Sequence, residues 1–193
     1  MVDDAVLTGA DFADGDELKP EGGAEVLRGS QVADTARVAV VVARFNEWVT
    51  RSLLAGAMDA WRSVGGNDER VTVAWVPGAV ELTATAKKLA DGGWDAVVCL
   101  GCVIRGETDH YDAVVNQCAQ GIKEVSVQTG VPCVFGVLTC DTLEQAVHRA
   151  GAKLGNGGRS AMLTAVEMAN LMGDIEERAG ELESLRAGNR GGG

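Results

Sequence analysis

The run of apolar residues at 37–43, RVAVVVA, restricts the possible folds more than any other stretch of this sequence. After the arginine its residues are apolar at successive positions, so a strand formed here needs cover on both faces. Comparable runs follow at 71–76, 95–100 and 133–138, and amphipathic segments separate them. Strands with two buried faces belong to parallel sheets whose crossover helices pack on both sides. We therefore predict an α/β fold.

Helical spacing of apolar residues and the turn residues between segments predict five helices. The first predicted helix ends near residue 63. The others span 79–90, about 110–128, 143–149 with Thr142 as the cap, and about 159–186. Four strands that alternate with helices give a three-layer, doubly wound, four-stranded parallel sheet with right-handed crossovers. We expect the flavodoxin-like strand order 2-1-3-4.

The length of 193 residues and the hydrophobic content of 46% predict one globular domain, which we place at 31–186. Residues 1–30 carry eight acidic and two basic residues with five glycines. Such a composition cannot bury enough surface to fold alone, so we expect an acidic, partly disordered N-terminal segment. Residues 187–193 are expected to form a flexible, glycine-rich tail.

The formal net charge of −11 argues against a nucleic-acid or anionic-membrane surface. No apolar run approaches the ~20 residues that a membrane helix needs. The five cysteines are an odd number in apolar settings, which favours buried thiols in a reducing compartment over a disulfide framework. We expect a cytoplasmic protein, or one of the plastid stroma if a transit peptide has been removed.

The segment 100–111, LGCVIRGETDHY, is where we expect the chemistry. It joins a strand to a helix, and strand carboxyl ends and helix amino ends converge in α/β folds. A helix start also offers unpaired amides to an anion. His110 is suited to carry protons near neutral pH, although a solvent-exposed histidine at a helix start is the alternative. The sequence lacks G-x-G-x-x-G and G-x-x-x-x-G-K-[ST], so dinucleotide and P-loop sites are not predicted.

Other candidates follow the remaining strands. Phe45 either stacks on a flat heterocycle or fills the core under the first helix, and the sequence favours neither. Glu81 either binds a polyol or only stabilises its helix start, and taken alone the second is favoured. Arg149 and the adjacent His148 would, by themselves, be surface residues. These residues predict a cleft for a small phosphorylated substrate and acid–base chemistry without a metal, but they do not name the reaction.

Five segments resemble lumazine synthases in order and spacing: ARFNEWVT, AWVPGAVEL, LGCVIRGETDHYDAVVN, VPCVFGVLTCDTLEQAVHRAG and AVEMANL. The similarity covers 27–172, and VIRG-x-T-x-HYD is its most specific motif. The resemblance implies a transferase-type enzyme of riboflavin biosynthesis that uses no cofactor or metal. It would condense 5-amino-6-(D-ribitylamino)uracil with 3,4-dihydroxy-2-butanone 4-phosphate to 6,7-dimethyl-8-ribityllumazine, releasing phosphate and water.

The resemblance also implies a role for each candidate residue. His110 would transfer protons during imine formation and phosphate loss, and Phe45 would stack on the pyrimidine. The remaining substrate contacts would come from Ala79, Val80 and Glu81 for the ribityl chain, from Cys102, Val103 and Ile104 for the ring edge, and from Phe135 of a neighbouring subunit. The phosphate would be bound by Glu107, Thr108 and Arg149.

Two positions depart from the family pattern. The late loop reads Gly155-Asn156-Gly157-Gly158, so Gly157 replaces the usual lysine near the phosphate and ribityl region, and His148 replaces a common glutamate or aspartate. Either Arg159 or Lys153 substitutes for that lysine, or substrate affinity is lower. A catalytically weak shell-forming or flavin/lumazine-binding relative is the alternative function.

The resemblance further implies a homo-oligomer with active sites shared between neighbouring subunits. Lumazine synthases form pentamers, and many close into sixty-subunit icosahedral shells. The segment 149–159 carries no insertion of the kind found in members without a shell, which favours the shell over the free pentamer. Small-molecule substrates and further copies of the chain are thus the expected partners, with no nucleic acid and no membrane.

Overall fold

The computed structural model describes residues 24–107 and 110–190, with side chains as far as residue 187. Expectations for 1–23, 108–109 and 191–193, including the phosphate-binding role of Thr108, lie outside these residues. The strands are β1 (Val38–Ala43), β2 (Val71–Val76), β3 (Ala96–Ile104) and β4 (Cys133–Cys140). All pairings are parallel and the order is β2-β1-β3-β4, which confirms the predicted sheet.

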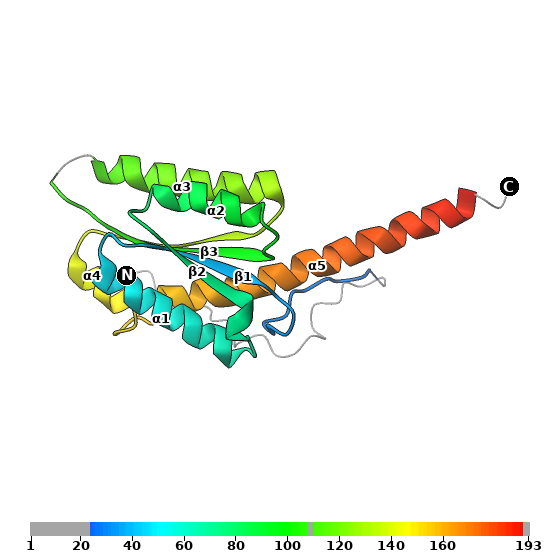
Figure 1. Ribbon diagram of the computed structural model, residues 1–193, viewed down its shortest axis with the longest axis horizontal. Helices are drawn as coiled ribbons and strands as arrows, with labels where there is room; N and C mark the ends of the chain where they lie inside the picture. The colour runs from blue at the N-terminus through cyan, green and yellow to red at the C-terminus, as the bar shows by residue number, and fades with distance from the viewer. Residues whose placement is uncertain (1–23, 108–109, 191–193) are drawn as a thin grey trace, which may run out of the picture.

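Helices cover both faces of this sheet and complete the three predicted layers (Figure 1). One face carries α2 (Glu81–Ala90) and α3 (His110–Thr129), and the other carries α1 (Glu47–Ser63), α4 (Leu143–Arg149) and α5 (Gly157–Arg190). A short 3-10 turn, Asp68–Arg70, precedes β2. At α4 the Thr142 hydroxyl accepts a hydrogen bond from the Gln145 amide at 3.2 Å, as expected for an N-terminal cap.

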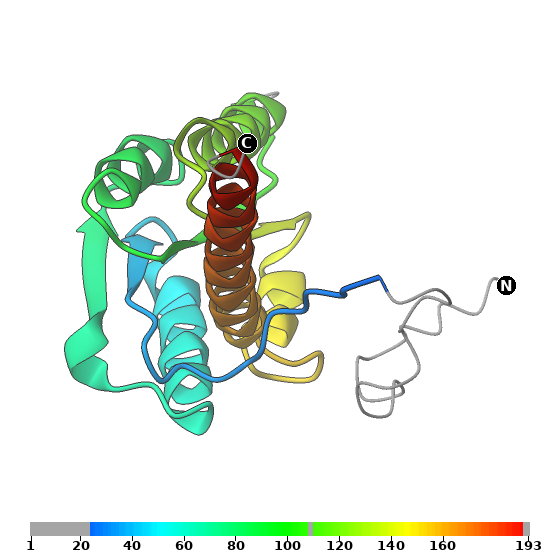
Figure 2. The ribbon, with the colours of Figure 1, turned by 90° about the vertical axis from the view of Figure 1, so that its right-hand side faces the viewer.

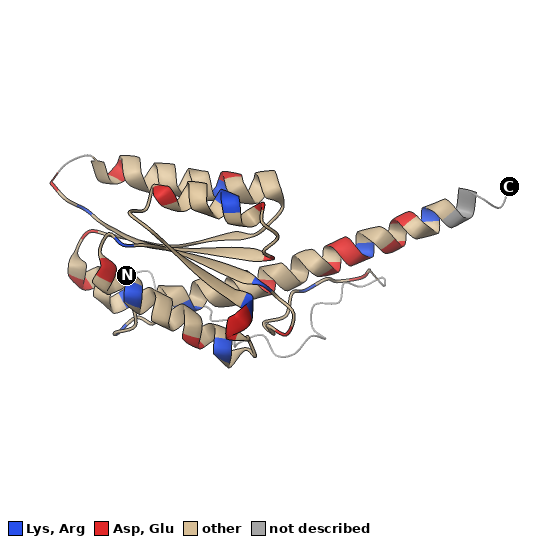
Figure 3. Ribbon diagram, in the orientation of Figure 1, with Lys and Arg blue, Asp and Glu red and all other residues tan. Residues whose placement is uncertain are grey.

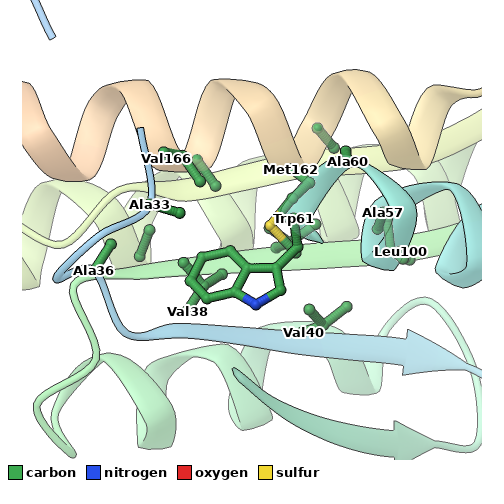
Figure 4. Close-up of a cluster of buried hydrophobic side chains, with 14 of the residues drawn as sticks. Ala33, Ala36, Val38, Val40, Ala57, Ala60, Trp61, Leu100, Met162 and Val166 are labelled. Carbon is green, nitrogen blue, oxygen red and sulfur yellow. The ribbon is translucent and has the colours of Figure 1, made fainter. Parts of the chain in front are cut away.

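Strand β1 shows why the first apolar run is continuous. Val38, Val40 and Val42 point into the core beneath α1 and α5, whereas Ala39, Val41 and Ala43 point into the core beneath α2 and α3. Each of these residues is at most 1% exposed. Trp61 of α1 fills the first core and lies among Ala33, Ala36, Val38, Val40 and Met162 (Figure 4). Burial of so much apolar surface on both faces anchors the sheet and fixes the positions of its carboxyl ends.

Two strands are longer than the sequence predicted. Strand β3 continues past Leu100 to Ile104, and β4 continues past Leu138 to Cys140. The two extensions pair with each other, Val103 opposite Thr139 and Ile104 opposite Cys140. Backbone hydrogen bonding between the extensions therefore turns residues 101–104, expected as a loop, into strand.

Helix α5 is also longer than expected, since it starts at Gly157 and runs to Arg190. Its last part projects from the body of the molecule, and from 173 to 187 all residues except Arg178 are exposed (Figure 1). The part of the predicted N-terminal segment that is described, 24–30, approaches this helix from one side in the view of Figure 2. Asn170 donates hydrogen bonds to the Ser30 and Val32 carbonyls at 2.7 and 2.9 Å, and Arg178 pairs with Glu25 at 2.6 Å.

Charged side chains lie on the helices and connections rather than on the strands of the sheet (Figure 3). The cysteines are free thiols, four of them buried and Cys133 half-buried, which confirms their expected role as small apolar residues. Within the described ranges, no helix is both long and apolar enough to cross a membrane.

Candidate functional site

A cavity of about 330 Å³ opens where the carboxyl ends of β1 and β3 meet the amino ends of α2 and α3. Eight predicted site residues from four separate segments line it: Phe45, Ala79, Val80, Glu81, Cys102, Val103, Ile104 and His110. Gly78, Gly106, Tyr111 and Val114 complete its walls. The exposed polar side chains of Glu81 and His110 thus share one apolar-walled space with an aromatic ring, which suits a flat heterocycle carrying polar substituents.

The turn after β1 presents Phe45 to this cavity. The amides of Arg44 and Phe45 donate to the carbonyls of Val76 and Pro77 at 2.8 and 3.1 Å, which ties the turn to the end of β2. Asn46 then adopts a left-handed backbone with φ of 58°, a conformation that asparagine tolerates better than most residues. Phe45 is 69% exposed, so the interpretation of this ring as a core residue is wrong.

The side chain of Asn46 links two walls of the cavity, a role that the sequence analysis did not assign. Its amide nitrogen donates to the Cys102 carbonyl at 3.0 Å. This bond joins the turn after β1 to the extension of β3, segments that are far apart in the chain. The signal that was available is an asparagine directly after a strand, since asparagine is enriched where the backbone turns left-handed.

Glu81 begins α2 beside a glycine that leaves room for it. A Cβ added at Gly78 would lie 3.0 Å from the Glu81 carboxylate oxygen Oε2. The next residue, Leu82, is completely buried and anchors the helix start. The carboxylate therefore stays exposed at the cavity wall while the helix below it is held by the core.

Cys102 contributes its backbone to the cavity, because its side chain turns to the other face of the sheet. There it packs with Val49, Cys140 and Ala146 in a small apolar cluster. Burial, with a smaller contribution from nearby Cys140, raises the pKa of the Cys102 thiol from 9.0 to about 12. The thiol is thus protonated near neutral pH and is not a nucleophile.

Arg105, inside the most specific motif, is engaged by other side chains. Its guanidinium contacts Asp141 at 3.0 Å and Asp112 at 3.4 Å, and it lies over the Tyr111 ring at 4.1 Å. Hydrogen bonds to both carboxylates raise the pKa of Arg105 above its usual value. This arginine braces the segment after β3 against α3 and β4, so a cation for a bound phosphate must come from elsewhere.

Three other predicted residues lie outside the cavity. Glu107 is exposed and does not line it, and Phe135 is a 39% exposed side chain in the middle of β4. Arg149 lines a second cavity, of about 490 Å³, which is formed by the end of β4 and by α4. One copy of the chain therefore does not bring the predicted phosphate-binding arginine to the cavity that holds His110.

The loop after Arg149 is held by Asn156, whose importance was also missed from the sequence. The side-chain nitrogen of Asn156 donates to the Ser52 and Ala150 carbonyls at 2.8 and 3.2 Å. Its side-chain oxygen accepts from the Gly158 amide at 2.8 Å. Asn156 therefore ties the end of α4, the start of α5 and α1 together, which fixes where Arg149 lies.

Comparisons with known proteins agree with this architecture. The family model described as 6,7-dimethyl-8-ribityllumazine synthase matches residues 35–173. The chain is 53% identical over 140 residues to the chloroplastic 6,7-dimethyl-8-ribityllumazine synthase of Spinacia oleracea. That alignment covers 72% of this chain and 63% of the spinach protein, so the chain matches less than two thirds of the relative's length. Together with the parallel sheet of order 2-1-3-4, these matches show that the chain belongs to the 6,7-dimethyl-8-ribityllumazine synthase family.

Proposed function

We propose that this protein is a transferase-type enzyme of riboflavin biosynthesis. It condenses 5-amino-6-(D-ribitylamino)uracil with 3,4-dihydroxy-2-butanone 4-phosphate, forms 6,7-dimethyl-8-ribityllumazine and releases phosphate and water. The observation that carries the proposal is the convergence of eight residues, expected from the family motifs, on one cavity. The family membership supports the same reaction. No observation favours the shell-forming or flavin-binding alternative.

The cavity supplies what this condensation requires. The exposed ring of Phe45 stacks on the pyrimidine, and Glu81 accepts hydrogen bonds from the ribityl hydroxyls. The amine of the pyrimidine attacks the ketone carbon and water leaves to give an imine, with His110 moving the protons. Loss of phosphate then leaves a carbonyl on the four-carbon unit, the ribitylamino nitrogen attacks it, and a second water leaves as the ring closes. Holding both substrates together lowers the barrier by up to ~7–11 kcal/mol, so positioning is a large part of catalysis.

The phosphate lies, in this proposal, at the start of α3, where helix amides are unpaired. The guanidinium that completes its site is Arg149 of a second copy, because Arg105 is occupied by Asp112 and Asp141 and the chain's own Arg149 lines another cavity. Phe135 reaches the pyrimidine from the same second copy.

A second copy at β4 is supported by the character of that edge. Strand β4 is the last strand of the sheet, and apolar side chains near it are exposed: Val127 by 76%, Leu154 by 60% and Phe135 by 39%. Such an edge favours association with another chain. We propose a pentamer with shared active sites, closed into a sixty-subunit icosahedral shell.

Two cellular locations were expected, and the spinach relative favours one of them. Its name places that protein in the chloroplast. We therefore propose the plastid stroma rather than the cytoplasm. Imaging of the fluorescently tagged, full-length gene product tests this location, and an exclusively cytoplasmic signal would contradict it.

A turnover assay with both substrates, read by lumazine absorbance, tests the proposed reaction. We expect the wild type to turn over and His110→Ala to lower kcat by about 100-fold or more, since general acid–base catalysis typically contributes 10²–10⁴-fold. Gln117→Ala is the matched control, because Gln117 is an exposed residue of the same helix that does not line the cavity. Sedimentation should show particles of unchanged size in all three proteins.

The alternatives give different results in the same experiment. Intact wild-type particles without turnover would exclude the proposed reaction and favour the structural shell. A tightly bound yellow ligand in a protein without turnover would favour flavin or lumazine binding. Loss of the particle in His110→Ala would show that this histidine is structural.

A further inference from the structure

The second cavity, at the end of β4, has a composition suited to an anion. It is lined by Val137, Leu138, Thr139, Cys140, Gln145, His148, Arg149 and Leu154. Two of these are the basic residues of the last turn of α4, and two more carry neutral hydrogen-bonding groups. Among the described residues that line it, none is acidic. The cavity thus brings together a hydroxyl, an amide, an imidazole and a guanidinium. Such groups bind a phosphomonoester.

The two basic side chains of this cavity differ from the arginines that are paired with carboxylates. Five arginines are paired with carboxylates, namely Arg37, Arg51, Arg62, Arg105 and Arg178. In the part of the chain that the structure describes, neither His148 nor Arg149 forms such a pair. The nearby carboxylate, Asp141, is bound to Arg105. The positive charge of this cavity is therefore available to a ligand.

The backbone that carries the His148 imidazole is held in place. The residue is half-buried, and its carbonyl accepts a hydrogen bond from the Leu154 amide at 2.9 Å. Gln145 is also oriented, since its side-chain oxygen accepts from the Asp141 amide at 2.9 Å and leaves its nitrogen to donate. Donors fixed before a ligand binds lose little entropy on binding.

Gly157 lies beside this cavity but contributes no side chain to it. A Cβ at Gly157 would lie 3.2 Å from Leu138 Cδ2 and 3.7 Å from the Arg149 carbonyl oxygen. A side chain at 157 would therefore start from the wall of this same cavity, and in this chain it is missing. His148 stands next to Arg149 on that wall.

We propose that His148 is a positioning residue that contacts the phosphate beside Arg149. Its imidazole has one N–H donor when neutral and two when protonated. These donors add to the N–H donors of the Arg149 guanidinium. The ligand is the phosphomonoester of the ketone substrate. This inference rests on the proposed function. The phosphate group of the ketone substrate binds in the cavity of one copy, and the carbon skeleton of the same molecule reacts at His110 of the neighbouring copy.

The test measures phosphate binding and catalysis separately in the assembled protein. Inorganic phosphate is titrated calorimetrically into the wild type, His148→Ala, His148→Lys and the control Glu144→Ala, an exposed residue of α4 outside the cavity. We expect His148→Ala to weaken phosphate about tenfold, the loss typical of one hydrogen bond to a charged group. His148→Lys should restore binding, and Glu144→Ala should bind as the wild type does.

Steady-state kinetics on the same proteins give the second measurement. We expect His148→Ala to raise KM for the ketone phosphate about tenfold, again the value for one such hydrogen bond, and to leave kcat and KM for the pyrimidine unchanged. Wild-type phosphate affinity in His148→Ala, an equal loss for both substrates, or no rescue by His148→Lys would each overturn the inference. If His148→Ala does not fold, His148→Asn takes its place.

Failure of the proposed reaction would be distinguishable from failure of this inference. A wild type that binds phosphate through His148 but does not turn over would exclude the reaction and support the phosphate contact. A wild type that turns over, with His148→Ala indistinguishable from it, would support the reaction and exclude the contact.

Discussion

Substitution of Gly158 by alanine tests the close approach of α5 to α1. A Cβ at this position would lie 2.0 Å from the Leu53 carbonyl oxygen and 2.6 Å from the carbonyl carbon. Leu53 is completely buried in α1, so α1 and α5 must separate by more than ~1 Å to reach an ordinary contact, and packing around Trp61 and Met162 is then disturbed. Overpacking of this kind costs ~1–3 kcal/mol.

The net loss of stability is smaller than the cost of overpacking, because alanine is more favourable than glycine in a helix by ~0.5–1 kcal/mol. We expect Gly158→Ala to lower the free energy of unfolding by about 2 kcal/mol, the upper part of the overpacking range less this propensity gain. Urea unfolding followed by circular dichroism, at one fixed subunit concentration, measures it. Gly173→Ala in the same helix is the control, since its Cβ would meet no atom within 4 Å. If both variants were equally stable, the argued approach of α1 and α5 would be refuted.

Three further predictions concern the second cavity and the buried thiols. Arg149→Ala should raise KM for the ketone phosphate by about 10- to 100-fold, as expected for hydrogen bonds to a charged group, and leave KM for the pyrimidine unchanged in steady-state assays. Gly157→Lys should fold, because its only tight Cβ contact, at 3.2 Å, is with the flexible end of Leu138, and it should lower that KM a few-fold; an unchanged KM would place the new ammonium away from the phosphate. Burial raises the pKa of Cys102 to about 12 and of Cys118 to about 11 from 9.0. As the pH rises, these two thiols therefore lose their protons in the unfolded chain before they lose them in the folded one. Stability should therefore be constant below about pH 9 and fall as pH rises toward 11–12, and urea midpoints that do not fall between pH 8 and pH 10.5 would contradict this.

The candidate site was predictable where it follows directly from strand and helix order. His110, Glu81 and Phe45 each come directly after a strand or at a helix start, and parallel strands bring these positions to one edge. The family motifs added the neighbouring residues of the same segments. Sequence alone left the exposure of Phe45 open, and only the structure decided it, since the ring is 69% exposed in the turn after β1.

Features that depend on two distant segments were not predictable in this way. The engagement of Arg105 requires Asp112 and Asp141 to meet it, and the role of Asn156 requires Ser52 from another helix. No local pattern reports such contacts, because each partner looks like an ordinary polar surface residue in its own segment.

By itself the sequence determined which segments form strands and which form helices, because apolar periodicity is a local property that decides which faces must be buried. It also determined the family, since the motifs are local strings. Only the tertiary structure decided where β3 and β4 end, since mutual pairing extends both strands to Ile104 and Cys140. It alone decided that Arg149 lies in a different cavity from His110. The physical reason is that distances between side chains depend on how whole helices and strands pack. That packing is determined by contacts throughout the chain.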